Sequence, residues 1–582
     1  MQSSLTPCWQ LCEILQPVRN FFLLWLARER GRSLGCQLRG LSSVLTLGKC
    51  KLALATLCKS HDCSKDHRTT GNNSSIMATT ASEANCSDAE PPPDTAAAAR
   101  PPPETDTAAA ASSDAKGGLR ALLRIAIPTA LANLAEYLPV SVALYFIGRR
   151  GDADDLDAVG LGRSYFNISC FSTSYGLISA LRTLCPQAAG ARKGKELHGL
   201  YAQRALAIVA LAAIIGIIGI YFADAVLIHV LGQPKQLAKR AQRYGLALLP
   251  ALFGIPCMTI VQRVMTAEGH VFANLAICAT VFATAPAWQN FLVYRHGLGF
   301  VGAAWASSIT NNQYLLLQIP YCLYVGLGHV FRPRSIGEVF DRRGVREFLG
   351  LSLPGLVASL LEWWSMEFVI ALAGTRRSPA VLAAVTCALN IQTVLEMCWL
   401  GAMVATSVAV GAQVGAGDPK GAKRAARLGV LAAFCAAAIT AAGLIVARPL
   451  IARLYSHDSD VVDLTSRCVP ALALLVFFDA QNVCIQGTLS GAGAPQRIAM
   501  SNLIGWYGVA APVALGLLFG LDLDQSAAPV LLCCCALGLA TSFVLQLLAL
   551  RSLDWEKQVQ EASGRLAEGT GALAEPLLTS DV

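Results

Sequence analysis

The chain is poor in charged residues. Of its 582 residues, only 14% are Asp, Glu, Lys or Arg, whereas soluble domains contain about 25%. Its 20 cysteines lack the spacing of zinc ligands, and several, such as Cys533, Cys534 and Cys535, lie inside apolar runs, where they pack as small hydrophobic residues. No Gly-x-x-x-x-Gly-Lys-[Ser/Thr] sequence is present, so P-loop ATP binding is not expected. Ordinary soluble, disulfide-rich secreted and P-loop proteins are therefore excluded, and no metal site is predicted.

The chain is instead rich in long apolar blocks. Hydrophobic residues make up 54% of the chain, and between about residues 120 and 550 they recur in blocks long enough to cross a hydrocarbon core of about 30 Å. No sizeable soluble domain is left over, which excludes a single-pass receptor. We predict an all-α membrane protein with twelve transmembrane helices at 121–147, 157–185, 200–222, 243–265, 272–294, 300–326, 345–374, 381–410, 425–447, 465–489, 498–520 and 527–550.

Two polar tails flank these spans. Residues 1–118 are predicted to be a disordered, low-complexity N-terminal tail in which Met77 offers an alternative start, so that residues 1–76 are either a targeting segment or dispensable. Residues 551–582 are predicted to be the C-terminal tail. The loops after even-numbered spans hold slightly more Lys and Arg than the loops after odd-numbered spans, and Arg263 is counted in the even-numbered set. The acidic clusters lie in the loops after odd-numbered spans. Both termini are therefore predicted to be cytosolic.

The spans fall into two similar halves. Residues 331–344 form a charged cytosolic loop between an N-lobe, residues 119–330 with spans one to six, and a C-lobe, residues 345–550 with spans seven to twelve. Because each half contains an even number of spans, both insert with the same orientation and leave a cleft between them. The fold prediction is two pseudo-symmetric six-helix lobes, which is a transporter architecture by analogy. Three pairs share an offset of 226 residues: Pro128 and Pro354, Glu136 and Glu362, Gly148 and Gly374.

Acidic residues inside the spans are the candidate functional groups. A charge at the bilayer centre costs about 2.5–3.5 kcal/mol, so it usually faces a cavity or a partner. Glu362 is flanked by Leu361 and Trp363, which disfavours its ionised form and lets it exchange a proton near neutral pH. A cationic substrate beside it would expel that proton, and such competition is the minimal physics of an antiporter. The alternative is a structural carboxyl bonded to a neighbouring helix.

Other polar residues extend this candidate site. Glu136, one turn after Asn133, is predicted to be the N-lobe's own proton or Na⁺ site. Asp479 shares its span with Gln481, which indicates a wet helix face. We predict coupling of H⁺ or Na⁺ at Asp479 and Glu136, and substrate binding at Gln481.

Two further acids lie close to these positions in the sequence. Glu367 lies about 140° around the helix from Glu362, so only one of the two is expected to line the cleft. Glu396 follows Asn390 in span eight, and both are predicted to contact substrate.

Several stretches resemble a known family. Leu361-Glu-Trp-Trp-Ser-Met-Glu367 is similar to a signature of eukaryotic multidrug and toxic compound extrusion (MATE) transporters. The resemblance covers about residues 119–550 and continues in three further stretches: Asn167 to Gly190, Val414-Gly-Ala-Gly-Asp-Pro419 and Phe478-Asp-Ala-Gln-Asn482.

The resemblance implies a secondary active antiporter with alternating access between its lobes. Such a protein exports organic cations, xenobiotics or secondary metabolites in exchange for H⁺ or Na⁺. It implies coupling roles for Glu362 and Glu367, an acidic site at Asp479, and substrate contacts from Trp363 and Asn167. It also implies a monomer in a plasma or vacuole-type membrane, surrounded by lipid, with no cofactor other than the coupling ion, no catalytic residue and no nucleic-acid partner.

Some positions depart from the family pattern, and two other functions stay open. Asn390 stands where some relatives have Glu, Ala409 where the family has Arg, and Arg182 where Asp is common, so the substrate is not fixed. A lipid-linked sugar flippase of similar architecture would need a strongly cationic cleft, whereas the charges within these spans are mostly acidic. A membrane enzyme would need a histidine inside a span, and the candidates lie at span ends or in loops: His229, His270, His296 and His329.

Overall fold

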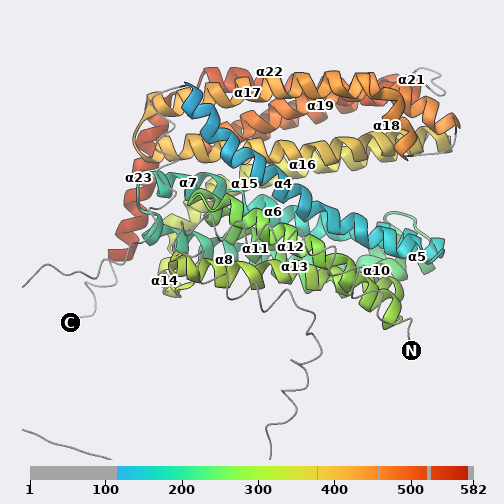
Figure 1. Ribbon diagram of the computed structural model, residues 1–582, viewed down its shortest axis with the longest axis horizontal. Helices are drawn as coiled ribbons and strands as arrows, with labels where there is room; N and C mark the ends of the chain where they lie inside the picture. The colour runs from blue at the N-terminus through green and yellow to red at the C-terminus, as the bar shows by residue number, and fades with distance from the viewer. Residues whose placement is uncertain (1–114, 376–377, 456–458, 521–525, 575–582) are drawn as a thin grey trace, which may run out of the picture. The chain divides into compact units, whose positions relative to one another are not determined.

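The computed structural model describes residues 115–375, 378–455, 459–520 and 526–574, and every regular element there is helical. Most of the predicted N-terminal tail, including Met77, lies outside the described residues. The all-α prediction is confirmed. Figure 1 shows two groups of helices, with the long helix α4 running obliquely between them. The first group comprises α4 Ala115–Gly148, α5 Ala153–Phe166, the π-helix η3 Asn167–Phe171, α6 Ser172–Ile178, α7 Leu181–Gly190, α8 Gly194–Tyr221, α9 Ala223–His229, α10 Lys235–Leu248, α11 Ala251–Ala267, α12 Val271–Gln289, η4 Asn290–Arg295, α13 Gly299–Tyr324 and η5 Leu327–Phe331.

The second group follows a short connection in the chain. It comprises α14 Ile336–Val339, α15 Arg342–Gly374, α16 Pro379–Gly415, α17 Pro419–Val446, α18 Arg448–Tyr455, α19 Ser459–Ala492, α20 Pro495–Asn502, the π-helix η6 Leu503–Ala510, α21 Ala511–Gly520, α22 Ala527–Arg551 and α23 Trp555–Ala574. We call the first group the N-lobe, and α15 to α22 the C-lobe.

Most of the expected spans are single long helices. Within the described ranges, nine helices are long and apolar enough to cross a membrane, and the bent pair α10–α11 makes a tenth. The two other predicted spans differ for physical reasons. Span six corresponds to α13, whose middle carries the polar run Asn311-Asn312-Gln313. Span two is divided into α5, η3, α6 and α7.

The break in span two coincides with a side-chain hydrogen bond of Ser172. Ser172 Oγ donates to the carbonyl oxygen of Asn167 at 2.8 Å, and such side-chain bonds compete with the regular helical ladder. The π-helix η3 covers these residues, and a turn at Ser179 separates α6 from α7. The break lets span two approach the C-lobe, because Gly176 of α6 packs on the backbone of Leu356 in α15. Small residues permit such close helix contacts in membranes.

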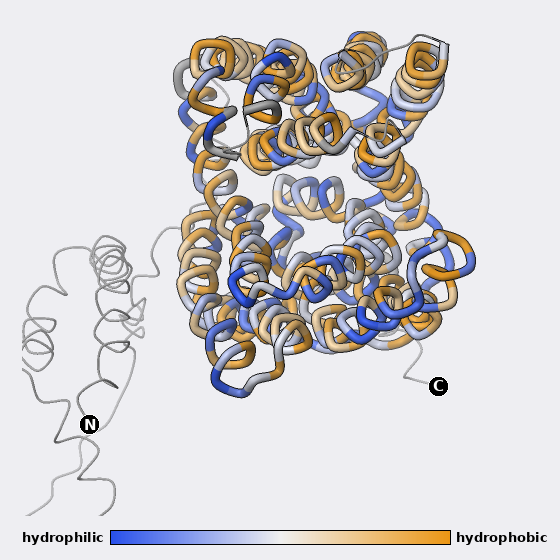
Figure 2. Tube along the Cα trace, turned by 90° about the vertical axis from the view of Figure 1, so that its right-hand side faces the viewer, coloured by the Kyte–Doolittle hydropathy of each residue, from blue (hydrophilic) through white to orange (hydrophobic). Residues whose placement is uncertain are grey.

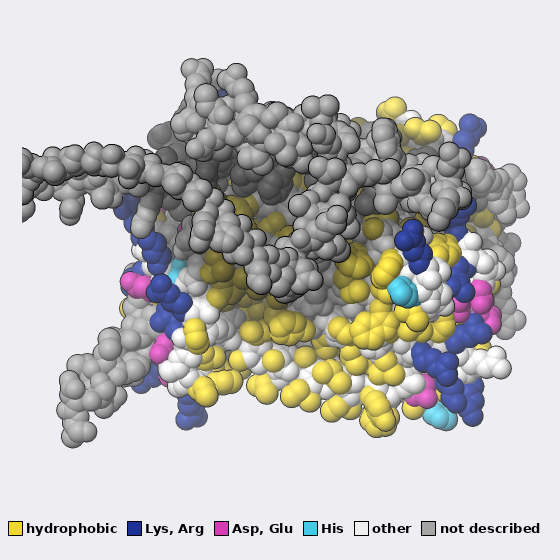
Figure 3. Space-filling view, turned by 60° about the horizontal axis from the view of Figure 1, so that its bottom comes forward, with side chains coloured by type: hydrophobic (Ala, Val, Ile, Leu, Met, Phe, Trp, Pro, Cys, Tyr) yellow, Lys and Arg dark blue, Asp and Glu magenta, His cyan; other side chains and the backbone are white. Residues whose placement is uncertain are grey.

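The outer surface is that of a membrane protein. In Figure 3 a broad hydrophobic band lies between two zones rich in Lys and Arg, one at each end of the helices. Large apolar side chains also stand outward from the helices, including Ile215 of α8 and Ile439 of α17, both 74% exposed. The end view in Figure 2 shows hydrophobic segments along the outer margins of both helix groups. Lipid, rather than water, is the solvent that suits this surface.

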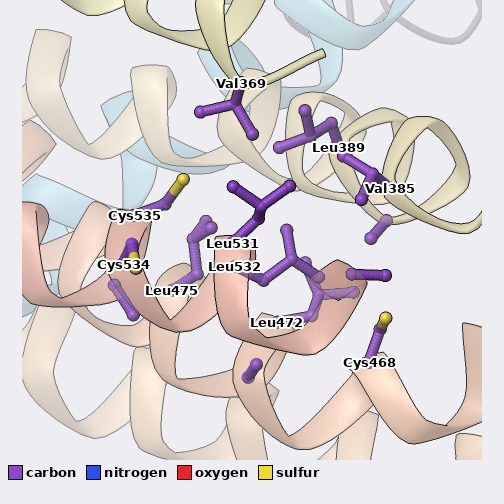
Figure 4. Close-up of a cluster of buried hydrophobic side chains, with 14 of the residues drawn as sticks. Val369, Val385, Leu389, Cys468, Leu472, Leu475, Leu531, Leu532, Cys534 and Cys535 are labelled. Carbon is purple, nitrogen blue, oxygen red and sulfur yellow. The ribbon is translucent and has the colours of Figure 1, made fainter. Parts of the chain in front are cut away.

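Each lobe also has a packed interior of its own. In the C-lobe, α15, α16, α19 and α22 bury a cluster that includes Leu472 and Leu531 (Figure 4). Cys534 and Cys535 belong to this cluster and form no disulfide. They are packing residues, as the sequence indicated, whereas Cys533 is exposed.

The lobes pack on each other with the symmetry that the repeat predicts. Span one, α4, packs along span eight, α16, and span seven, α15, packs against α6 of span two. Exchanging the two lobes converts one of these contacts into the other. Gly401 of α16 lies against the backbone of Ala126 and Ala130 in α4, and Gly355 of α15 lies against Ser179. The two pseudo-symmetric six-helix lobes are therefore confirmed.

Hydrogen bonds join the lobes at one end, which we call the α23 end. Gln187 Nε2 of α7 donates to the carbonyl oxygen of Gly491 in α19 at 3.0 Å, and Ser407 Oγ of α16 donates to the carbonyl oxygen of Arg182 at 2.7 Å. Thr183 Oγ1 also donates to the carbonyl oxygen of Ser490. The lobes are thus closed against each other at this end.

The helix α23 lies across the same end and touches both lobes (Figure 1). Trp555 and Ala562 pack on the C-lobe, while Leu566 joins a cluster with Leu197 and Tyr201 of α8. Arg565 Nη2 donates to Gln187 Oε1 at 3.3 Å. Residues 551–582 were predicted to be a tail. Their helix α23 could not be recognised as a span because it is amphipathic and too polar.

A buried histidine–carboxylate contact joins three N-lobe helices near the α23 end. His198 of α8 is fully buried; its Nδ1 lies 3.1 Å from Glu268 Oε1, just after α11. Its Nε2 donates to the carbonyl oxygen of Cys185 in α7 at 3.0 Å. Burial alone would raise the pKa of Glu268, but the interaction with His198 outweighs it and leaves the pKa below its ordinary value of 4.5.

This pair predicts a stability that depends on pH. A carboxyl whose folded pKa is lowered stabilises the fold above its unfolded pKa, and the contribution is lost as the pH falls through the lowered value. We expect Glu268→Gln to destabilise the protein by about 1–3 kcal/mol at neutral pH. The melting temperatures of the purified variant and wild type should converge at acidic pH. A difference in melting temperature that persists unchanged at acidic pH would contradict a stabilising role for the contact between Glu268 and His198.

Candidate functional site

Three of the predicted acids converge inside the C-lobe, and we call them the carboxyl cluster. Glu362 comes from α15, Glu396 from α16 and Asp479 from α19, and they are 9%, 9% and 1% exposed. Gln392 Nε2 donates to Asp479 Oδ2 at 3.1 Å and lies 3.3 Å from Glu396 Oε2. Glu362 is paired with Gln486 and is close enough to interact electrostatically with the other two acids. A single amide thus joins carboxyls from two helices, with the third beside them.

The cluster has spare capacity for a small cation. Asp479 Oδ1 and Gln392 Oε1 are buried and have no hydrogen-bond partner among the described residues. Gln481, predicted to bind substrate, is fully buried, and its two polar side-chain atoms also have no partner in the described part of the chain. It lies two residues after Asp479 in α19, about 200° around the helix, and so faces away from the cluster. Buried acceptors without donors are costly, and several carboxylates in one low-dielectric site cannot all be ionised without a compensating cation. The arrangement can therefore hold an exchangeable proton, or a cation that compensates the carboxylates.

Two other predicted residues lie away from this cluster. Glu367 and Asn390 are exposed. Neither side chain has a hydrogen bond or ion pair to another described residue. Glu367 therefore stands on a different helix face from Glu362, as the helical spacing predicted. Their roles stay predictions.

The N-lobe contains a related pair. Gln262 Nε2 of α11 donates to Glu136 Oε2 of α4 at 3.3 Å. This resembles the pairing of Glu362 with Gln486, because spans one and four supply the first pair and spans seven and ten the second. Each pair also has an arginine near it, because Arg263 interacts electrostatically with Glu136 and Arg182 with Glu362.

An aromatic stack, formed by Phe171, Tyr175 and Trp363, joins the lobes. The Trp363 ring lies parallel to Phe171 at a centroid distance of 5.5 Å and stacks on Tyr175 at 5.4 Å. All three side chains are half-buried. Asn167, predicted to contact substrate, is exposed one turn before Phe171 at the start of η3. The stack offers aromatic faces next to Glu362, the residue that precedes Trp363.

Three residues of this region were not among the predicted site residues. Gln392 and Gln486 gave no strong signal, because amides are common in spans and only the rotation of α16 and α19 shows where they point. Arg263 was counted as a loop charge. The structure places it within α11, where its Nη2 lies 3.3 Å from the hydroxyl oxygen of Tyr175.

The comparisons with known proteins agree with this geometry. The MatE family model matches twice, over residues 128–287 and 354–515. The two matches begin 226 residues apart, which is the offset of the internal repeat. Together they cover more than half of the chain.

Curated relatives and solved structures extend the match. Protein DETOXIFICATION 1 and Protein DETOXIFICATION 12 of Arabidopsis thaliana are 28% and 29% identical to this chain, over 78% of it in each case and over 94% and 93% of the relatives. The crystal structure of the eukaryotic MATE transporter AtDTX14 superposes with a TM-score of 0.72 at 25% identity, over 78% of this chain and all of the other. An outward-facing multidrug resistance MATE transporter shares the fold, with a TM-score of 0.66 at 18% identity, over 77% and 98% of the two chains. This chain therefore belongs to the MATE family in its eukaryotic form: it is a multi-pass membrane transporter of the multidrug and toxic compound efflux type, which handles small organic substrates and is not an enzyme.

Proposed function

We propose that the protein is a cation-coupled antiporter that exports organic cations or related metabolites in exchange for H⁺ or Na⁺. The observation that carries this proposal is the carboxyl cluster of three buried acids from three helices. Two of them are bonded to one amide, Gln392, and the third, Glu362, is paired with Gln486. A proton or Na⁺ can neutralise part of the cluster, and an organic cation can do so in its place. Because both cannot bind at once, one ion is released as the other enters.

The two lobes supply the alternation that antiport needs. Contacts between α7 and the ends of α16 and α19 close the α23 end in the described conformation. Breaking these contacts and closing the opposite end would expose the same site to the other side of the membrane. The Glu136–Gln262 pair is a second candidate coupling site in the N-lobe.

We further propose the setting in which this exchange takes place. Lys and Arg in the even-numbered loops support a cytosolic α23 end, so both termini face the cytosol and export runs toward the other side. The protein works as a monomer surrounded by lipid in a plasma or vacuole-type membrane, with no cofactor other than the coupling ion and no nucleic-acid partner. The flippase alternative is less well supported, because its polyanionic headgroup would be repelled by the carboxyl cluster.

Reconstitution into liposomes tests this function. Purified protein is incorporated into vesicles, and uptake of ethidium, an aromatic organic cation, is followed while a pH gradient or a Na⁺ gradient is imposed separately. We expect one of the two ion gradients to drive accumulation well above the level in empty vesicles, and ATP to have no effect. Accumulation that required ATP, or that ignored both gradients, would overturn the proposal.

A further inference from the structure

Two arginines lie within the N-lobe spans without a carboxylate in contact. Arg182 of α7 and Arg263 of α11, which we call the arginine pair, are half-buried. No ion pair within 4.0 Å among the described residues involves either of them. Their Nε atoms are buried and have no hydrogen-bond partner in the described part of the chain. Charged side chains are rare and costly within spans, where they mark sites that bind charge.

The arginine pair is arranged around one aromatic ring. The guanidinium carbon of Arg182 lies 5.3 Å from the ring centroid of Tyr175, and that of Arg263 lies 5.7 Å from it. Arg182 Nη1 also lies 3.3 Å from Met403 Sδ, a weak acceptor. Cation–π contacts offset only part of the cost of burying a guanidinium, and the two cations repel each other. Glu362 near Arg182 and Glu136 near Arg263 offset part of this cost. An anion held between the two arginines would offset more of it.

The repeat shows that these cations are not part of the shared scaffold. Gly190 and Gly415 are equivalent at an offset of 225 residues, and the same offset places Ser407 opposite Arg182. Equating Gln262 with Gln486 places Gly487 opposite Arg263. The C-lobe therefore folds without either charge. A feature present in one lobe only is explained by what that lobe binds rather than by the packing that both lobes need.

Charges of both signs lie near the aromatic stack. Tyr175 touches the arginine pair, and Trp363, stacked on Tyr175, follows Glu362 in the chain. Arg182 and Glu362 are close enough to interact electrostatically but do not form an ion pair. A ligand that carries an acidic group, an aromatic ring and an amine would find a partner for each: the arginine pair, the aromatic stack and the carboxyl cluster.

From this arrangement we infer that the arginine pair is a subsite for the acidic group of an aromatic zwitterion. The aromatic stack holds the ring, the arginine pair binds a carboxylate or sulfonate through charge-assisted hydrogen bonds, and the amine occupies the carboxyl cluster. This inference rests on the proposed antiport and names its substrate class. Only the amine competes with the coupling ion, so the acidic group adds specificity without changing the exchange.

Rhodamine B and its ethyl ester form a matched pair of probes. Rhodamine B is an aromatic zwitterion with a free carboxylate, and the ester retains the cationic ring system but masks the acid. Binding of each dye to the purified protein is measured by fluorescence anisotropy for wild type, Arg182→Gln and Arg263→Gln. Arg427→Gln, which changes an exposed arginine on α17, serves as the matched control.

We expect wild type to bind rhodamine B more tightly than the ester. Each substitution in the arginine pair should weaken rhodamine B binding at least about tenfold, because a hydrogen bond to a charged group is lost. Binding of the ester should stay the same or improve, and Arg427→Gln should change neither dye. Equal loss for both dyes, or no preference of wild type for rhodamine B, would overturn the inference.

The same dyes separate this inference from the proposed function. Rhodamine B binding that depends on the arginine pair, in a protein whose vesicles move neither dye under either ion gradient, would uphold the subsite and overturn the antiport proposal. Gradient-driven transport of both dyes, unaffected by Arg182→Gln or Arg263→Gln, would uphold antiport and overturn the subsite.

Discussion

Replacing Glu362 by glutamine is expected to lower gradient-driven transport to less than about a tenth of the wild-type rate, an effect equivalent to about 1.4 kcal/mol. The amide has nearly the same shape and can keep the contact with Gln486. It cannot bind and release a proton, and it does not carry the negative charge that attracts a cation. Asp479 and Glu396 would remain, but the cluster would have lost one of its exchangeable charges. The measurement is the initial rate of ethidium uptake into vesicles under the driving ion gradient.

Two further variants make this result interpretable. Glu367→Gln changes an exposed acid five positions along the same helix and should have a smaller effect, because the structure places Glu367 away from the cluster. Glu556→Gln changes an exposed acid on α23 and should have none. Elution of all variants as single species from a sizing column would show that they fold. Full ion-driven uptake by Glu362→Gln would refute the coupling role.

The second large effect is expected at the contact between the lobes. Gly190 of α7 and Gly415 of α16 lie so close to the opposite lobe that a Cβ atom on either would collide with main-chain atoms, those of Ala412 and of Gln187 respectively. Main-chain atoms within a helix cannot rotate away. Gly190→Ala or Gly415→Ala should therefore prevent closure of the α23 end and reduce transport at least about tenfold, since a barrier increase of about 1.4 kcal/mol is sufficient.

Amide hydrogen exchange reports the same change without a transport assay. Opening of the α23 end should speed exchange in the segments that close it, the ends of α7 and α16. Gly443→Ala on α17 is the control, because a Cβ at Gly443 would meet no atom within 4 Å. Unchanged exchange and unchanged flux in both contact variants would show that this end can close in another way.

The fold could be predicted because its signals, apolar length and an internal repeat, are present in the order of the residues alone. Apolar length identifies a span within a single segment, and the pairing of Pro128 with Pro354 and of Glu136 with Glu362 identifies the repeat. The break in span two was not foreseen, because the hydroxyl of Ser172 looks like any other serine until its bond to Asn167 is seen. The helix α23 was also missed, because its apolar positions are too few for a span.

The candidate site was accessible only in part. Glu362, Glu396 and Asp479 were identified because a carboxyl in an apolar run is unusual. Their convergence depends on the rotation of three helices about their axes, which no single segment determines.

The basic residues were harder to place. Arg182 was noticed as a departure from the family pattern but had no assigned role. Arg263 was taken for a loop charge because it lies near a span end. Its place beside Tyr175 follows from the packing of α11 against α6 and α7.

The position of α23 has a thermodynamic consequence for regulation. The helix continues the C-lobe chain, and its Leu566 joins a cluster that contains Leu197 and Tyr201 of the N-lobe as well as Phe348 and Leu351 of α15. Opening at this end would break part of that cluster. If the lobes alternate as proposed, its contacts with both lobes would set part of the balance between the two membrane-facing states. By reciprocity, a molecule or modification that favours attached or detached α23 shifts that balance by the same free energy with which each state favours its binding. In the proposed cycle, α23 would thus influence a site that it does not touch.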